Sequence, residues 1–144
     1  MNMETSKKAL ITVHTTIHLP IHLVWKIWTT PSDIMHWNKA SDEWHTPLAE
    51  NDLRVGGKFC YQMAAKDGSM AFDFDGVYST VNRLKLIEYK LSDDRVVRVN
   101  FTAMGNDTYV VEEFEAEEVN SLDIQKMGWQ AILTSFKNYC ESMQ

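Results

Sequence analysis

Apolar residues recur at three-, four- and seven-residue spacings near the end of the chain, which predicts an amphipathic helix over residues 120–139. Its apolar stripe consists of Leu122, Trp129, Ile132, Phe136 and Tyr139. Asn120 is expected to cap the N-terminus. The opposite face is expected to contact water through Lys126, Gln130, Ser135 and Lys137. Since such a stripe does not stabilise an isolated helix in water, the helix needs a partner surface.

The chain before this helix alternates between apolar and polar positions with the period of two that is typical of half-buried strands. Strands are predicted over residues 9–19, 44–48, 58–63, 70–81, 84–91, 95–104 and 108–116. The turns between the later strands contain Asp67-Gly68, Asp93-Asp94 and Gly105-Asn106-Asp107. Hairpin-linked strands form a meander, and we predict that this strongly twisted sheet curls around the helix.

Two short helices are predicted between the first strand and the rest of the sheet, over residues 21–29 and from Pro31 to Trp37. Trp37 is interpreted as a core residue beneath these helices, and a position facing a ligand is the alternative. Gly56-Gly57 marks a tight bend where side chains would block the approach of the chain. An ion pair between Asp52 and Arg54 is expected to hold the loop before this bend.

Strand parity assigns a row of mostly aromatic side chains to the inner face of the sheet, opposite Trp129 and Ile132. The row comprises Phe59, Tyr61, Met63, Phe72, Phe74, Tyr78, Val97 and Phe101. These side chains either fill the core or line an apolar cavity. Gly76 and Gly128 favour space, although close backbone packing is the commoner reason for a helical glycine, which costs up to about 1 kcal/mol relative to alanine.

The pattern of the last predicted strand does not determine which of its faces points inward, because Glu112 and Glu113 lie on opposite faces, each with apolar neighbours. Whichever glutamate is buried must be paired, protonated or in contact with a ligand. A polar cluster at the mouth of a cavity could be formed by His45, Asp52, Arg54, Glu112, Glu118 and Gln125. His45 could act there as a base or hydrogen-bonding group, or could be an ordinary loop histidine.

Composition narrows the choice of partners. A net charge of −6 and a pI near 5.3 argue against nucleic acid and against anionic membrane surfaces. No apolar run approaches the roughly 20 residues that span a bilayer, so membrane insertion is not expected. His14 and His18 do not form a metal pair, because on a strand they lie about 13 Å apart. No metal or cofactor is expected.

The domain organisation is predicted to be simple. Residues 1–8 are polar and lack the apolar segment of a secretion signal, so we expect a disordered or frayed N-terminus. Residues 9–144 form one domain, long enough to bury a core without disulfides. Cys60 and Cys140 are interpreted as reduced thiols, and the expected location is cytoplasmic.

Several segments resemble a known family. They are Ala40–His45, Asp52–Phe59, Asp67–Ser69 with Phe72–Phe74, and Gln125–Gln130 with its Gly128-Trp129 pair. On these residues the chain resembles the SRPBCC, or START-like, superfamily. Within it, the chain is similar to small bacterial proteins related to the C-terminal domain of the activator of the heat shock protein 90 ATPase. The resemblance implies an α+β helix-grip fold, in which a curved seven-stranded antiparallel sheet encloses the C-terminal helix and a cavity lies between them.

The favoured function is therefore binding of a small, largely apolar or aromatic molecule, with no catalytic residue assigned. The candidate cavity residues are Trp37, His45, Phe59, Tyr61, Met63, Phe72, Phe74, Tyr78, Val97, Phe101, Glu112, Gln125, Trp129 and Ile132. The resemblance implies two alternatives. One is a module that interacts with a chaperone in the stress response, and the other is a cyclase or hydrolase that uses His45 or a buried carboxylate.

Overall fold

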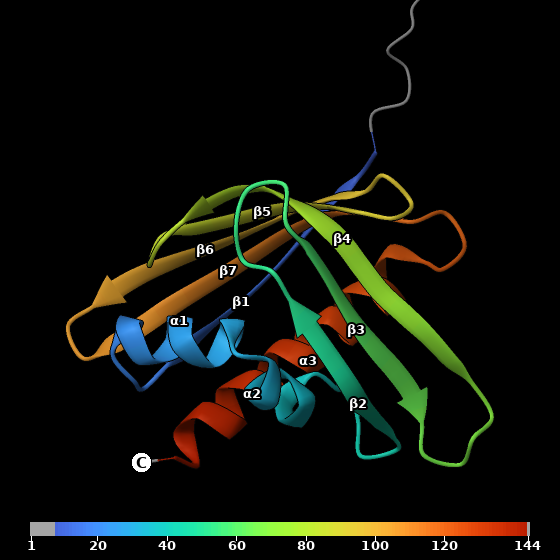
Figure 1. Cartoon of the computed structure of the whole chain (residues 1–144), viewed down its shortest axis with the longest axis horizontal. Coiled ribbons are helices and arrows are strands. Elements are labelled where there is room, and N and C mark those ends of the chain that lie inside the picture. Colours follow the sequence, from blue (N-terminus) through green and yellow to red (C-terminus); the bar gives the residue numbers. More distant parts are fainter. Residues whose placement is uncertain (1–7, 144) are drawn as a thin grey trace, which may run out of the picture.

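The computed structural model describes residues 8–143, so residues 1–7 of the predicted N-terminal tail lie outside it. The elements follow the order β1 (Leu10–Ile17), α1 (Ile21–Thr29), α2 (Pro31–Trp37), β2 (Trp44–Asn51), β3 (Lys58–Ala65), β4 (Ala71–Asn82), β5 (Leu86–Leu91), β6 (Val96–Met104), β7 (Asp107–Glu115) and α3 (Leu122–Glu141). The predicted α+β class and the order of the elements are confirmed, including two short helices directly after the first strand (Figure 1).

The sheet has seven strands in the order β1-β7-β6-β5-β4-β3-β2, and every neighbouring pair is antiparallel. Strands β2 to β7 form the predicted meander, and β1 pairs with β7, so the first and the last strand are neighbours in the sheet. The sheet curves, and α3 crosses its concave side while α1 and α2 lie at one end (Figure 1). This is the helix-grip arrangement.

Aromatic packing joins α3 to the sheet and to the short helices. The Trp129 ring stacks on Phe114 of β7 with the ring centroids 3.9 Å apart. Phe136 lies edge-on against Trp28 of α1, at 4.8 Å, and against Trp37 of α2, at 4.9 Å. The aromatic side chains of α3 thus fix the helix at two places along its length.

Three features of α3 differ from the prediction. Ser121 caps the helix in place of Asn120, since its hydroxyl accepts a 3.1 Å hydrogen bond from the backbone N–H of Ile124. The face predicted to be wet is partly covered, because α3 packs alongside β1, and the Lys137 ammonium donates a 2.6 Å hydrogen bond to the Thr16 carbonyl. Leu122, predicted to be in the apolar stripe, is 52% exposed.

The bend before β3 is confirmed. Gly56 has a φ of +82°, which non-glycine residues rarely adopt. A Cβ atom on Gly57 would lie 2.0 Å from the Asp52 carbonyl oxygen, so no side chain fits there. The Arg54 Nε–H donates to the Asp52 carboxylate at 2.9 Å, as expected for the ion pair before this bend.

Candidate functional site

A hollow of about 250 Å³ lies between α3 and the inner face of the sheet. The structure places eleven of the predicted site residues around it: Trp37, Phe59, Tyr61, Met63, Phe72, Phe74, Tyr78, Glu112, Gln125, Trp129 and Ile132. Most of these side chains are buried or half-buried, but Phe72 is 47% exposed. We infer that the hollow reaches the surface beside Phe72.

Three predicted residues do not line the hollow. Phe101 packs edge-on against Trp25 and Trp28 and belongs to the core beneath α1. Val97 is fully buried, on β6 opposite Tyr89 of β5. His45 is exposed on β2 and, like Asp52, Arg54 and Glu118, lies outside the lining. The predicted polar cluster is thus reduced to Glu112 and Gln125.

Six residues that the sequence analysis did not assign to the site complete the lining: Trp28, Asn38, Ile87, Tyr89, Arg95 and Glu117. Strand parity carried a usable signal for Ile87 and Tyr89, which alternate with exposed Lys90 and half-buried Glu88. Arg95 and Glu117 lie beyond strand ends, where period-two reasoning no longer predicts the direction of a side chain.

Glu112 is the glutamate of β7 that faces inward, and this resolves the open parity of that strand. Its side chain is 5% exposed and lies between Val13 of β1 and Val99 of β6 in the sheet register. Within residues 8–143 its carboxyl group has no hydrogen bond or ion pair with another side chain or with the backbone. Burial raises the pKa of Glu112 from 4.5 to about 8, so the carboxyl is mostly protonated at neutral pH.

The remaining walls are aromatic, with few polar atoms. The Phe59 ring contacts Tyr61, Tyr78 and Tyr89 at centroid distances of 5.1, 5.3 and 4.8 Å. The Tyr78 hydroxyl donates a 2.5 Å hydrogen bond to the Asn51 side-chain oxygen. Burial and, to a lesser extent, the neighbouring Glu112 raise the pKa of Tyr89 well above its usual value. At neutral pH these tyrosines are therefore uncharged.

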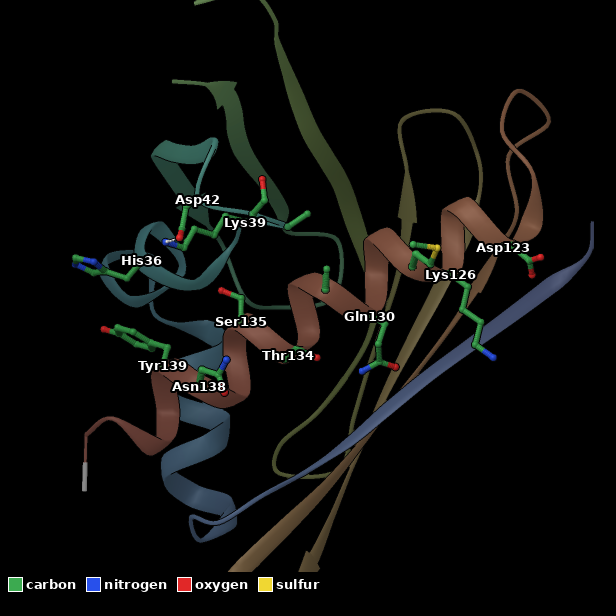
Figure 2. Close-up of a pocket in the computed structure, with 14 residues that line it drawn as sticks. His36, Lys39, Asp42, Asp123, Lys126, Gln130, Thr134, Ser135, Asn138 and Tyr139 are labelled. Atoms are coloured by element: carbon green, nitrogen blue, oxygen red, sulfur yellow. Dashed lines mark hydrogen bonds and ion pairs between the residues drawn. The ribbon is translucent and has the colours of Figure 1, made fainter. Parts of the chain in front are cut away.

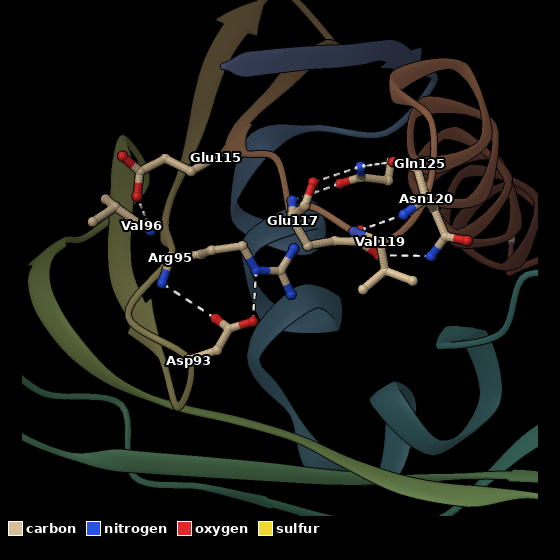
Figure 3. Close-up of polar contacts among 8 residues, drawn as sticks. All are labelled: Asp93, Arg95, Val96, Glu115, Glu117, Val119, Asn120 and Gln125. Carbon is tan, nitrogen blue, oxygen red and sulfur yellow. Dashed lines mark hydrogen bonds and ion pairs between the residues drawn. The ribbon is translucent and has the colours of Figure 1, made fainter. Parts of the chain in front are cut away.

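Gln125 forms hydrogen bonds with the backbone at one end of the hollow (Figure 3). Its side-chain oxygen accepts from the Glu117 backbone N–H at 2.9 Å, and its amide donates to the carbonyls of Glu117 and Asn120 at 3.1 and 2.9 Å. This buried amide therefore holds the segment that links β7 to α3.

Two charged groups lie at the same end, and both have partners. The Glu117 carboxylate accepts 2.7 Å hydrogen bonds from the backbone N–H groups of Val119 and Asn120 and from the Asn120 amide. The Arg95 Nε–H donates to Asp93 at 2.8 Å, and its guanidinium points toward Glu117 (Figure 3). The hydrogen bonds from Asn120 lower the pKa of Glu117, which keeps this carboxylate ionised.

A larger and more open groove, of about 1240 Å³, runs along the outer face of α3 (Figure 2). The segment after α2 forms one wall, where Lys39 pairs with Asp42 at 3.2 Å. The other wall is α3 itself, with polar side chains such as Gln130 and Asn138 and the exposed Met127. The charged groups of this groove are solvated, in contrast to Glu112.

The histidines that the sequence analysis rejected as a metal pair make separate contacts on the outside of the protein. The His14 ring lies 5.8 Å from the Tyr109 ring, and His18 Nδ1 lies 3.3 Å from an Asp107 carboxylate oxygen. In the part of the chain that the structure describes, no group of three or more His, Cys, Asp or Glu side chains could hold a metal ion. No helix of this part is long and apolar enough to cross a membrane.

Comparison with known proteins identifies the family. The family model described as "Activator of Hsp90 ATPase homolog 1-like protein" matches residues 18–141. The chain belongs to this AHSA1-like family. Its members adopt the SRPBCC fold, and the predicted resemblance is therefore confirmed. No curated protein matches the sequence significantly.

Solved structures agree with this assignment. An AHSA1-like protein from Aeromonas hydrophila is 41% identical, with a TM-score of 0.88 over 94% of each chain. A protein from Cytophaga hutchinsonii is 54% identical, with a TM-score of 0.80 over 92% of each chain. A protein from Nitrosomonas europaea, at 17% identity and a TM-score of 0.77 over 93% of this chain and 95% of its own, shows the shared fold alone. The AHSA1-like fold suggests a ligand-binding or Hsp90-ATPase-activator-like domain.

Proposed function

We propose that this AHSA1-like protein binds a small, largely apolar molecule in the hollow between the sheet and α3. One observation carries the proposal: the hollow of about 250 Å³ contains the carboxyl group of Glu112, which is 5% exposed and has no partner within residues 8–143. A buried polar group without a partner destabilises a protein unless something satisfies it. A bound molecule with an apolar body and one polar group would supply both the missing packing and the missing hydrogen bond.

The size and lining support a small guest. At about 30 Å³ per molecule in the liquid, the hollow has the volume of about eight waters, so a guest with one aromatic ring or a short chain fits best. The hollow is lined by three tryptophans, Trp28, Trp37 and Trp129, whose fluorescence should respond when it is occupied. Small-molecule sites in proteins are typically apolar pockets with a few polar groups, as here.

The test is a thermal-shift and tryptophan-fluorescence titration with indole and 2-phenylethanol, together with mass spectrometry of molecules that co-purify with the protein. Two variants of α3 receive the same new side chain. Ile132→Phe adds a ring on the face that lines the hollow, whereas Thr134→Phe adds it on the exposed face that lines the outer groove. Circular dichroism and urea unfolding of both variants establish that they remain folded.

We expect Ile132→Phe to weaken binding by at least about tenfold, since the new ring occupies the volume that the guest needs. Thr134→Phe should leave binding within about twofold of the parent. Loss of binding in Thr134→Phe alone would move the site to the outer groove. Absence of any binding or co-purifying molecule in the parent protein would refute the proposal.

The family description favours a second candidate, contact with an Hsp90-type chaperone, and the outer groove is the surface to test for it. Met127, 71% exposed, lies on this groove, and Ile124, 60% exposed, lies nearby on α3. The ATPase rate of a purified Hsp90-type chaperone should then change when the protein is added. Met127→Glu should abolish the effect and Ile132→Phe should not. An unchanged ATPase rate would exclude this candidate.

The expected cytoplasmic location remains part of the proposal. It is supported by Cys60 and Cys140, which are both free thiols, the state that a reducing compartment maintains. Fractionation of the native cells with an antibody against the protein tests this location.

A further inference from the structure

We propose that the guest of the hollow is a small organic amine in its positively charged form, with Glu112 as its counter-ion. This inference rests on the proposed binding function and adds the chemical class of the ligand. It follows from the charge balance inside the hollow, from the aromatic walls and from the volume.

Among the acidic and basic residues of the lining, Glu112 is the one whose side chain has no partner in the described residues. Arg95 donates through Nε to Asp93 at 2.8 Å, and the Glu117 carboxylate accepts three hydrogen bonds from Val119 and Asn120. Glu112, in contrast, has no partner anywhere in the described residues 8–143. A cation that enters the hollow could therefore pair with Glu112 without breaking an existing ion pair or hydrogen bond of that side chain.

The walls favour a cation over an anion or a purely apolar guest. The faces of aromatic rings carry partial negative charge and attract ammonium groups within about 6 Å of the ring centre. Phe59, Phe74, Tyr89 and Trp129 bring such rings to the same hollow as Glu112. An anion would be repelled by the ring faces and could not form an ion pair with Glu112. A neutral guest would form only ordinary hydrogen bonds with the carboxyl group, without a charge of opposite sign.

Binding of a charged amine must be linked to release of a proton, because the carboxyl group of Glu112 is protonated at neutral pH when the hollow is empty. The other titratable or charged groups that face the hollow are Tyr61 of β3, Tyr78 of β4, Tyr89 of β5, Arg95 before β6 and Glu117 after β7. The three tyrosines have raised pKa values, and Glu117 has a lowered one. The lining residues of α1, α2 and α3 carry no titratable group, and β1 places Val13 opposite Glu112. Between pH 6 and 8, Glu112 is therefore the group of the lining that changes its charge.

The experiment compares two probes with the same skeleton: 2-phenylethylamine, which is charged at neutral pH, and 2-phenylethanol, which is not. Isothermal titration calorimetry is carried out at pH 6, 7 and 8, each in two buffers with different ionisation enthalpies, so that the number of protons released is measured directly. The proteins are the parent, Glu112→Gln, which keeps the shape of the side chain, and Glu113→Gln, the adjacent control on the other face of β7.

We expect the amine to bind the parent at least about tenfold more tightly than the alcohol at pH 8. Its affinity should rise by up to about tenfold per pH unit from pH 6 to 8, and close to one proton should be released at pH 7. Glu112→Gln should remove the proton release and the preference for the amine. Glu113→Gln should behave as the parent.

The possible failures are distinguishable. If the alcohol binds and the amine binds no more tightly, or binds without proton release, the charged class of the ligand is wrong while the binding function stands. If the preference for the amine persists in Glu112→Gln, Glu112 is not the counter-ion and the inference is overturned. If neither probe nor any other small molecule binds the parent protein, the proposed function fails together with the inference.

Discussion

Replacing Glu112 with glutamine should change how the stability of the protein depends on pH. In the folded protein the carboxyl group has a pKa of about 8, whereas its ordinary value is 4.5. Between these two pH values the unfolded chain has lost this proton and the folded protein has kept it. The free energy of unfolding must therefore fall as pH rises, because raising the pH favours the state that binds fewer protons.

The magnitude follows from the size of the pKa shift. Each pH unit between 4.5 and about 8 should lower the free energy of unfolding by about 1.4 kcal/mol, or roughly 5 kcal/mol over the whole interval. At pH 7 most of this loss, about 3 kcal/mol, should already be present. This is a large part of the 5–15 kcal/mol that typically stabilises a domain. Below pH 4.5 the contribution of Glu112 should no longer depend on pH.

The assay is urea unfolding of the parent protein and of Glu112→Gln at pH 5, 6, 7 and 8, followed by tryptophan fluorescence. The relevant quantity is the difference in the free energy of unfolding between the two proteins, because other titrating groups contribute equally to both and cancel. The free energy of unfolding of Glu112→Gln should rise relative to that of the parent by about 1.4 kcal/mol per pH unit up to pH 7, and less steeply near pH 8. The neutral amide adds only a constant offset.

Glu113→Gln is the matched control, since Glu113 is adjacent on β7 but half-buried on the opposite face. Its difference from the parent should vary by less than about 0.5 kcal/mol over the same pH range. A flat difference for Glu112→Gln, or one that moves in favour of the parent as pH rises, would refute our reading of Glu112 as a buried carboxyl without a partner.

Three further substitutions, each measured by urea unfolding, test the tight bend before β3, the glycine within α3 and the hydrogen bonds that Gln125 makes to the segment before α3. Gly57→Ala should lower the free energy of unfolding by more than about 2 kcal/mol, because the new Cβ would meet the Asp52 carbonyl oxygen at 2.0 Å; a neutral effect would contradict the tight bend. Gly128→Ala should raise it by up to about 1 kcal/mol, since alanine favours the helix and nothing lies within 4 Å of the new Cβ; destabilisation would mean that this space is needed. Gln125→Leu should cost about 2–4 kcal/mol and speed hydrogen exchange at Val119 and Asn120, because the segment before α3 loses three hydrogen bonds; unchanged exchange there would show that Gln125 does not hold this segment.

The sequence predicted the fold well because the decisive patterns are local and periodic. The bounds of α1 and α2 follow from Pro20, Pro31 and helical spacing, and the inner faces of β3, β5 and β6 follow from alternation. The bend at Gly56-Gly57 was also predictable, since only glycine tolerates a backbone that passes so close to itself.

The site was predictable only in part. β7 alternates glutamate and apolar residues on both faces, so its parity depended on the register with β1 and β6, which periodicity does not reveal. Arg95 and Glu117 reach the hollow from strand ends, and their directions depend on turn geometry. Gly128 left two explanations open, and the structure excludes close backbone packing, since nothing lies within 4 Å of a Cβ atom built there.

The pairing of β1 with β7 has a consequence for biosynthesis. The opening strand buries Ile11, Val13 and Ile17, but its neighbour in the sheet is encoded about a hundred residues later. At translation rates of roughly 5–20 residues per second, this strand leaves the ribosome about 5 to 20 seconds before its partner. Throughout that interval the apolar side chains of β1 lack their partner strand, so the sheet cannot be completed until β7 has been synthesised.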